Sequence, residues 1–234
     1  MQFQKKPNLL RSSIVFFFIF TAQMLFSQEV LRGEIDVEIE PIYAINLGVK
    51  SPLSNADAIL WALQDAVTAF SAMIYGWSFE YIPANRERGI RETLDLNLTN
   101  EIDFGDEKMK ITDAHIEGDI FITWFDYELD SVQKARIASY KSSPTFGVNA
   151  QGFAPLFGED GIKDRRDIKK AALEDAAKKA IREKLRLLYK NRPHKVKGFL
   201  SLSKFPLFKM NSGRWSSVAS FRLKVLDVEN YTAF

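Results

Sequence analysis

Four side chains that could hold a metal ion alternate along one short segment: Asp113, His115, Glu117 and Asp119. Residues that alternate along a straight strand share one face, and carboxylate and imidazole groups ligate hard or borderline metals. Gly118 interrupts the set and is expected to bend the chain there. We therefore predict a solvent-facing acidic turn at this position and no metal site.

Catalytic chemistry has few other candidates in this sequence. The chain has no cysteine, which excludes disulfides, thiolate zinc sites, iron–sulfur clusters, cysteine nucleophiles and an acylated N-terminal cysteine. It also lacks the short motifs of serine hydrolases, zinc proteases and nucleotide-binding loops. A carboxylate pair for glycoside hydrolysis stays open, because acidic residues crowd the first half, but no two of them stand out. We predict no catalytic residue and no cofactor.

Three phenylalanines lie in a segment rich in glycine and proline, residues 142–161, which we predict to be a loop or linker. Phe146, Phe153 and Phe157 would be costly to leave in water. They are expected either to tuck beneath the loop or to form a contact for a partner.

Basic side chains form a second candidate surface, on an amphipathic helix predicted from residue 164 to residue 190. Its outer face carries Lys178, Lys179, Arg182 and Arg186. Such a face is solvated, docks an acidic surface or binds an anionic membrane. The candidate interaction surface therefore comprises Phe146, Phe153, Phe157, Lys178, Lys179, Arg182 and Arg186.

A second long helix is predicted in the first half of the chain. It is expected to begin at Ser54 or Asn55 and to end before Gly76, with more than half of its circumference apolar and buried. Its polar residues, among them Asp65 and Ser71, fall on the narrow opposite stripe.

The remaining periodic segments predict strands, because apolar and polar residues alternate in them. These strands are expected at residues 34–45, 94–98, 118–129, 195–202 and 218–228, with a hairpin turn at 211–213. The predicted fold class is α+β, with one or two units of a long helix packed on an antiparallel sheet.

The two predicted helices share a pentapeptide. Residues 62–66 read A-L-Q-D-A and residues 172–176 read A-L-E-D-A, and a predicted strand pair follows each helix. This order favours an internal duplication, with convergence of alanine-rich helices as the alternative.

Charge is divided between the two halves of the chain. Residues 28–130 contain 7 basic and 21 acidic residues, whereas residues 131–234 contain 22 basic and 9 acidic residues. The halves are expected to attract each other within one molecule or between molecules, unless both are merely solvated faces. We predict an acidic α+β unit at 28–135, a linker or loop at 136–163 and a basic α+β unit at 164–234. The predicted partner is a protein or a second copy, and not nucleic acid.

The N-terminus has the layout of a secretory signal peptide, predicted at residues 1–27. Lys5, Lys6 and Arg11 precede an uncharged run from Ile14 to Phe26. The run is short for a hydrocarbon core of roughly 30 Å, so cleavage after Ser27 is expected rather than a permanent anchor. Because no cysteine is available for acylation, we predict export to a bacterial periplasm and not a lipoprotein.

A helix containing A-L-Q-D-A precedes a strand pair that carries K-I-T-D-A-H-I-E-G-D-I-F-I-T, residues 110–123. The segment from Asn55 to Thr123 resembles the small α+β domain of bacterial flagellar H-ring assembly proteins and related outer-membrane lipoproteins. The resemblance implies a helix on a short antiparallel sheet and a structural role in ring assembly at the outer membrane. It implies no catalytic set.

The sequence thus predicts a non-catalytic, exported envelope protein with an assembly or scaffolding role. The most specific form of this prediction is association with the flagellum. The alternative is a periplasmic enzyme or ligand-binding protein that uses the acidic first half. A third possibility is membrane-surface contact through the basic helix at 164–190.

Overall fold

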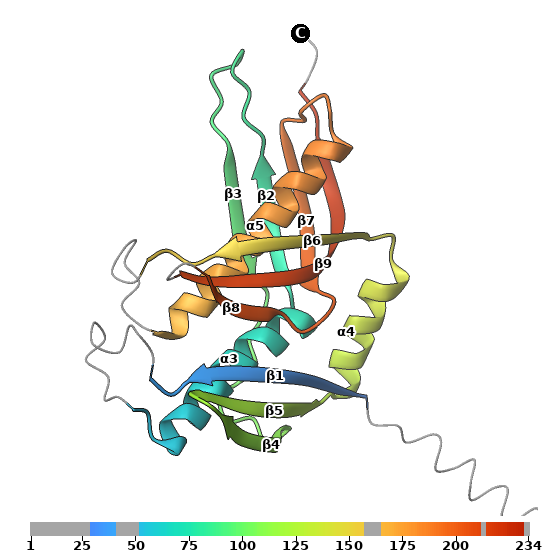
Figure 1. The fold of residues 1–234 in the computed structure, drawn as a ribbon. Helices are drawn as coiled ribbons and strands as arrows, with labels where there is room; N and C mark the ends of the chain where they lie inside the picture. Colours follow the sequence, from blue (N-terminus) through green and yellow to red (C-terminus); the bar gives the residue numbers. More distant parts are fainter. Residues whose placement is uncertain (1–28, 41–51, 157–164, 212–213, 232–234) are drawn as a thin grey trace, which may run out of the picture.

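The computed structural model describes residues 29–40, 52–156, 165–211 and 214–231, and these form three helices and nine strands in two antiparallel sheets (Figure 1). The elements are β1 (Val30–Glu38), α3 (Asn55–Ile74), β2 (Trp77–Ile82), β3 (Thr93–Leu98), β4 (Met109–Glu117), β5 (Ile120–Glu128), α4 (Ser131–Ser142), β6 (Phe146–Phe153), α5 (Arg165–Leu188), β7 (Lys195–Leu202), β8 (Leu207–Asn211) and β9 (Arg214–Glu229). The α+β class is confirmed. The predicted signal peptide at 1–27 and Phe157 lie outside the described residues.

Helix α3 is the first of the two predicted helices. Ser54 is its N-cap, and the Ser54 hydroxyl accepts a hydrogen bond of 3.2 Å from the backbone N–H of Asp57. The helix ends at Tyr75, and Gly76 follows with a φ of +62°, in the left-handed region that favours glycine. By length and composition α3 is apolar enough to cross a membrane, but in this fold half of its 20 residues are buried against other elements.

The smaller sheet has the strand order β1-β5-β4 and packs on one side of α3. Alternate residues of β1 and β5 point toward the helix, which buries Ile35, Val37, Phe125 and Tyr127 around Phe70 of α3. Burying a large apolar side chain stabilises the folded state by about 1.5 to 3 kcal/mol, so this cluster is a substantial core.

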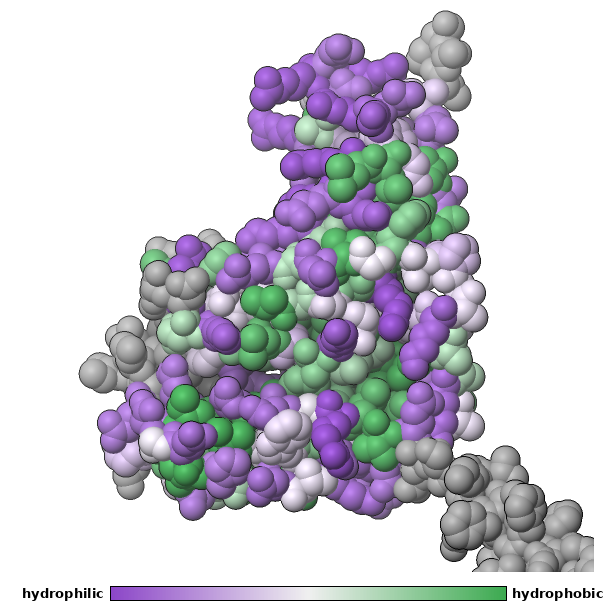
Figure 2. All heavy atoms as spheres, turned by 45° about the vertical axis from the view of Figure 1, so that its right-hand side comes forward, coloured by the Kyte–Doolittle hydropathy of each residue, from purple (hydrophilic) through white to green (hydrophobic). Residues whose placement is uncertain are grey.

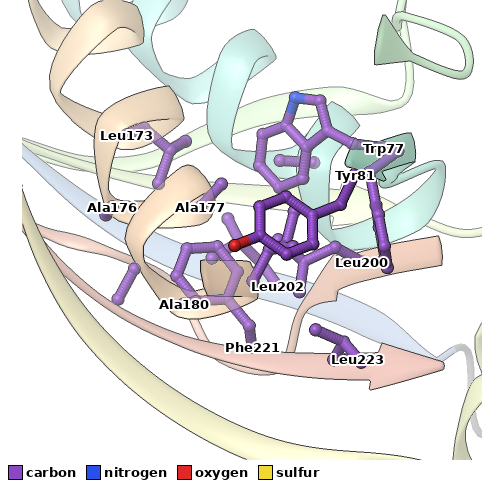
Figure 3. Packing of buried hydrophobic residues seen from close by; sticks show 14 of the residues in the cluster. Trp77, Tyr81, Leu173, Ala176, Ala177, Ala180, Leu200, Leu202, Phe221 and Leu223 are labelled. Atoms are coloured by element: carbon purple, nitrogen blue, oxygen red, sulfur yellow. The ribbon is translucent and has the colours of Figure 1, made fainter. Parts of the chain in front are cut away.

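The larger sheet has the order β3-β2-β7-β9-β6, and β8 pairs with β9. Helix α5 packs on β6 and β9. Ala176, Ala177 and Ala180 of α5 belong to the second core, and Figure 3 shows Ala177 and Ala180 beside the ring of Phe221. Because these helix side chains are small, the backbone of α5 lies close to the sheet.

The described part of the predicted linker, residues 136–156, is not a linker. It contains most of α4 and all of β6, which pairs along its length with β9. Helix α4 begins with a capping box in which Asp130 and Gln133 each accept the other's backbone N–H. The glycine content that suggested a loop has another cause, because Gly152 of β6 touches the backbone of α5.

The two predicted units also share one sheet, so the boundaries at 135 and 164 do not separate them in space. Strand β2 of the acidic half pairs with β7 of the basic half, with Trp77 opposite Leu200. In each half a long helix precedes an antiparallel pair, β2–β3 or β7–β9, and the two pairs meet at the centre of the sheet. The two pairs differ in connection, because β2 and β3 are consecutive in the chain whereas β8 lies between β7 and β9.

A side chain at Gly152 is expected to destabilise the fold. A Cβ atom there would lie 2.1 Å from the backbone nitrogen of Ala176 and 2.2 Å from the carbonyl oxygen of Ala172. Because the α5 backbone would have to move, Gly152→Ala is expected to lower the free energy of unfolding by about 2 kcal/mol in urea denaturation. Gly147→Ala in the same strand is the control, since no atom lies within 4 Å of its Cβ position. Equal losses in the two variants would contradict the packing argument.

Candidate interaction surfaces

Phe146 and Phe153 lie at the two ends of β6, beside α5. The Nζ atom of Lys184 lies 4.7 Å from the ring centroid of Phe146, and that of Lys179 lies 5.0 Å from the ring centroid of Phe153. A cation over an aromatic ring at an exposed site contributes about 0.5 to 1 kcal/mol. Basic side chains of α5 therefore partly cover both rings, although Phe146 keeps 36% of its surface exposed.

The middle of α5 contacts β6. Lys179 forms an ion pair of 2.8 Å with Asp175, and Lys178 is half-buried. The same Asp175 carboxylate accepts a hydrogen bond of 2.8 Å from the backbone N–H of Phe153. The structure thus joins Lys179 to Phe153, as part of the packing between α5 and β6.

Arg182 and Arg186, one turn apart on α5, converge on Glu92. The Arg182 Nε atom lies 2.5 Å from Glu92 Oε1, and the Arg186 Nη2 atom lies 3.2 Å from Oε2. Burial alone would raise the pKa of Glu92, but the hydrogen bonds and charges of the two guanidinium groups outweigh it and lower that pKa below its ordinary value. Glu92 therefore stays ionised at neutral pH. The basic residues of the predicted interaction surface thus fall into two groups: Arg182 and Arg186 bind Glu92, whereas Lys179 lies against β6.

Glu92 belongs to the acidic half, and further ion pairs link the halves within one chain. Lys195 lies 3.0 Å from Glu80, and Lys141 lies 3.6 Å from Glu29. Exposed pairs of this kind contribute roughly 0 to 1 kcal/mol each. The attraction expected between the halves thus operates within a single molecule.

A buried ion pair joins the halves in the interior. Lys169 Nζ of α5 lies 2.8 Å from Asp65 Oδ2 of α3, and the two side chains are 5% and 3% exposed. The same Nζ donates to the backbone carbonyl of Asp36 in β1 at 2.9 Å and lies 4.6 Å from the ring of Trp215 in β9. One ammonium group thereby connects four elements that are distant in sequence.

The expectation that Asp65 and Ser71 lie on the polar stripe opposite the buried face of the helix is wrong. Both are buried, and the Ser71 hydroxyl accepts the backbone N–H of Ile102 at 2.9 Å. Helical periodicity could not reveal these partners, because Lys169 lies 104 positions away from Asp65. The repeated pentapeptide carried a signal, since its aspartates, Asp65 and Asp175, both make contacts outside their own helix.

The alternating acidic segment forms β4 and its turn into β5. Asp113, His115 and Glu117 are exposed, with 3.3 Å between Asp113 Oδ2 and His115 Nδ1, and Gly118 turns the chain at a φ of +65°. Within the described ranges, no group of three or more histidine, aspartate or glutamate side chains lies close enough together to hold a metal ion.

Acidic side chains also line a groove of about 500 Å³ between α3, the connection after β3 and the start of α5. Glu101, Asp103 and Asp167 contribute its carboxylates, and all three are exposed. Glu101 and Asp103 come from the acidic half, whereas Asp167 and Lys170, which also lines the groove, come from the basic half.

An open edge of the smaller sheet was missed by sequence analysis. Eight of the nine residues of β4 are exposed, and no described residue pairs with its outer edge. Ile111 and Ile116 are 45% and 50% exposed, although they pair with the buried Phe125 and Phe121 of β5 and so share their face. Helix α3 covers that face in β1 and β5 and leaves it uncovered in β4.

A model of a protein family of uncharacterised function matches residues 20–231. The chain belongs to that family. No curated protein and no solved structure matches the chain.

Loss of the buried carboxylate at Asp65 is expected to destabilise the protein strongly. Asp65→Asn keeps the shape of the side chain but removes a countercharge from the buried ammonium of Lys169, which is expected to cost about 3 kcal/mol in urea denaturation. Asp103→Asn, at an exposed position, is the control and is expected to change stability by less than about 0.5 kcal/mol. The double variant Asp65→Leu with Lys169→Met, which removes both charges, is expected to recover much of the loss. Similar stabilities for Asp65→Asn and Asp103→Asn would refute a structural role for the pair.

Proposed function

We propose that this protein is a non-catalytic assembly protein of the bacterial periplasm that joins a second copy of itself through the open edge of β4. The observation that carries the proposal is the exposure of eight of the nine residues of this strand. An unpaired edge presents backbone N–H and C=O groups that pair with another strand, and proteins usually protect such edges. A long open edge with two exposed isoleucines therefore supports an interaction role.

A second copy fits this edge because β4 is complementary to itself. In an antiparallel pair with a two-fold axis at Ala114, Asp113 of each copy lies opposite His115 of the other. The same register places Ile116 of one copy opposite the β-bulge between Ile111 and Asp113 of the other. Because the bulge puts Ile111 on the same face as Ile116, the two isoleucines lie near each other on the face that is uncovered in the single chain. Cross-strand pairs of these kinds contribute roughly 0.2 to 1 kcal/mol each. The two small sheets would then form one continuous sheet with an isologous interface.

A charge swap across the proposed interface between the two β4 strands tests this register. His115→Glu places two carboxylates opposite each other, and Asp113→Lys places two basic residues opposite each other. Because the symmetry changes two pairs at once, each single variant is expected to weaken self-association about tenfold in sedimentation equilibrium. The double variant Asp113→Lys with His115→Glu restores opposite charges and is expected to associate like the natural protein.

Circular dichroism of each variant checks that β4 still pairs with β5. Glu107→Lys, at an exposed position before β4, is the charge-changing control and is expected to leave association unchanged. A natural protein that sediments as a monomer at low and high salt would refute self-assembly. Equal association of all variants would refute the register.

Export and an envelope role are supported by the signal-like residues 1–27 and by the resemblance to the flagellar ring-assembly domain. Deletion of the gene is expected to alter envelope structure or motility, and purification from the envelope is expected to recover the protein as an oligomer. If deletion changes neither property and purification recovers neither a second copy nor a partner, the envelope role is wrong.

A second candidate function is that of a periplasmic enzyme or ligand-binding protein that uses the acidic half. The groove favours it, with Glu101 and Asp103 from the acidic half and Asp167 from the start of α5. All three carboxylates are exposed, whereas binding and catalytic groups usually converge in an enclosed pocket, so this function ranks second.

A further inference from the structure

A cleft of about 730 Å³ lies between the β2–β3 connection, the C-terminal end of α5 and the start of β7. This volume is in the range of small-molecule sites. The cleft is far from β4 in the fold, and Figure 2 shows that hydrophilic side chains dominate the end of the molecule where these elements lie.

The floor of the cleft is apolar and rigid. Tyr81, Leu185 and Val196 line it and are 3%, 2% and 1% exposed, because they also belong to the core between α5 and the larger sheet. Tyr189 and Pro193 add apolar walls. The half-buried Ala84 and Tyr189 supply the apolar surface that a ligand with an aromatic or aliphatic body would remove from water.

The lining is strongly cationic. Arg86, Arg186, Lys190 and Arg192 line the cleft, and Glu92 is the one carboxylate among the described residues of the lining. That carboxylate is already neutralised by Arg186 and by Arg182 from outside the cleft. Arg86 and Lys190 are both exposed, and neither forms an ion pair with a described residue.

The turn after α5 fixes the position of Arg192, one of the basic residues of the lining. Arg192 has a backbone φ of +46°, which residues other than glycine rarely adopt. Its Nη1 atom donates a hydrogen bond of 3.2 Å to the backbone carbonyl of Ala84. The contact ties the turn after α5 to the β2–β3 connection. Both sides of the cleft are thereby held together without use of the remaining guanidinium donors.

We propose that this cleft binds an amphipathic organic anion, with a carboxylate, phosphate or sulfonate head among the basic side chains and an apolar body against Ala84 and Tyr189. Charge-assisted hydrogen bonds from arginine and lysine recognise such heads, and contact with this apolar wall adds affinity for the body. The cleft shares no residue with the β4 edge, so ligand binding can be tested independently of the proposed self-association.

Fluorescence titration with anilinonaphthalene sulfonate tests the proposal, with phenylnaphthylamine as the matched dye that lacks the sulfonate. The sulfonate dye is expected to bind at least about tenfold more tightly than the neutral dye at low salt. The double variant Arg86→Glu with Lys190→Glu is expected to weaken sulfonate binding by about tenfold or more and to leave the neutral dye unaffected. Ala84→Trp, which fills the cleft without a change of charge, is expected to weaken both dyes.

Two controls locate the binding. Lys204→Glu with Lys209→Glu reverses two exposed charges outside the cleft, and Ile111→Ser with Ile116→Ser removes the exposed apolar groups of β4. Both pairs are expected to leave sulfonate binding unchanged. Equal affinity for the two dyes, or an equal loss in the Arg86/Lys190 and Lys204/Lys209 variants, would overturn the proposal.

Competition distinguishes the two sources of such an anion. Displacement of the dye by dodecyl phosphate below its micellar concentration, but not by phosphatidylglycerol vesicles, indicates a free amphipathic anion. Displacement by the vesicles, together with flotation of the protein with them, indicates a lipid headgroup. Failure of both competitors to displace the dye would overturn the proposal.

Discussion

Helix α3 packs against two cores at once, and the rest of the fold depends on that constraint. Phe70 and Ile74 belong to the core of the smaller sheet, Ala72 belongs to that of the larger sheet, and Met73 contacts both. A helix buried on two sides keeps only a narrow strip in contact with water, so a charged residue off that strip needs a partner inside the protein. Asp65 is such a residue, and the partner that reaches it is Lys169.

The buried pair gives the division of charge along the sequence a structural meaning. An acidic core helix and a basic covering helix come together through Asp65 and Lys169, and exposed pairs such as Lys195 with Glu80 repeat the same polarity at the surface. Exposed pairs contribute little to stability, and a buried pair contributes mainly when its geometry is correct. We infer that charge complementarity chiefly selects how α5 lies against α3, while the apolar cores supply most of the stability.

Periodicity predicted the features that depend on local sequence. The N-cap at Ser54, the end of α3 before Gly76 and the turn at Gly118 all follow from neighbouring residues. The strand β6 was missed because Gly147 and Gly152 reduce strand propensity. The close contact of Gly152 with the backbone of α5 explains why a glycine occurs at that position. Helix α4 was also missed, although its capping box at Asp130 and Gln133 was visible in the sequence.

The candidate sites likewise depend partly on local sequence and partly on contacts between residues that are distant in sequence. The basic face of α5 was predicted from helical spacing, but its convergence on Glu92 depends on a connection between strands that no local pattern places there. The cleft could not be predicted for the same reason, since Arg86 and Lys190 are more than a hundred positions apart and meet only after β2 and β7 have paired.

The open edge and the cationic cleft lie at opposite ends of the molecule. In Figure 1, β4 is at the bottom, whereas the β2–β3 connection and the C-terminal end of α5 are at the top. A two-fold pair joined through β4 would therefore direct both clefts away from the seam. Binding of a ligand with a single anionic group would then be independent of protein concentration, while pairing would depend on it. Two anion sites held at a fixed separation bind a surface that carries many anionic groups more tightly than one site does, which gives pairing through β4 a functional consequence.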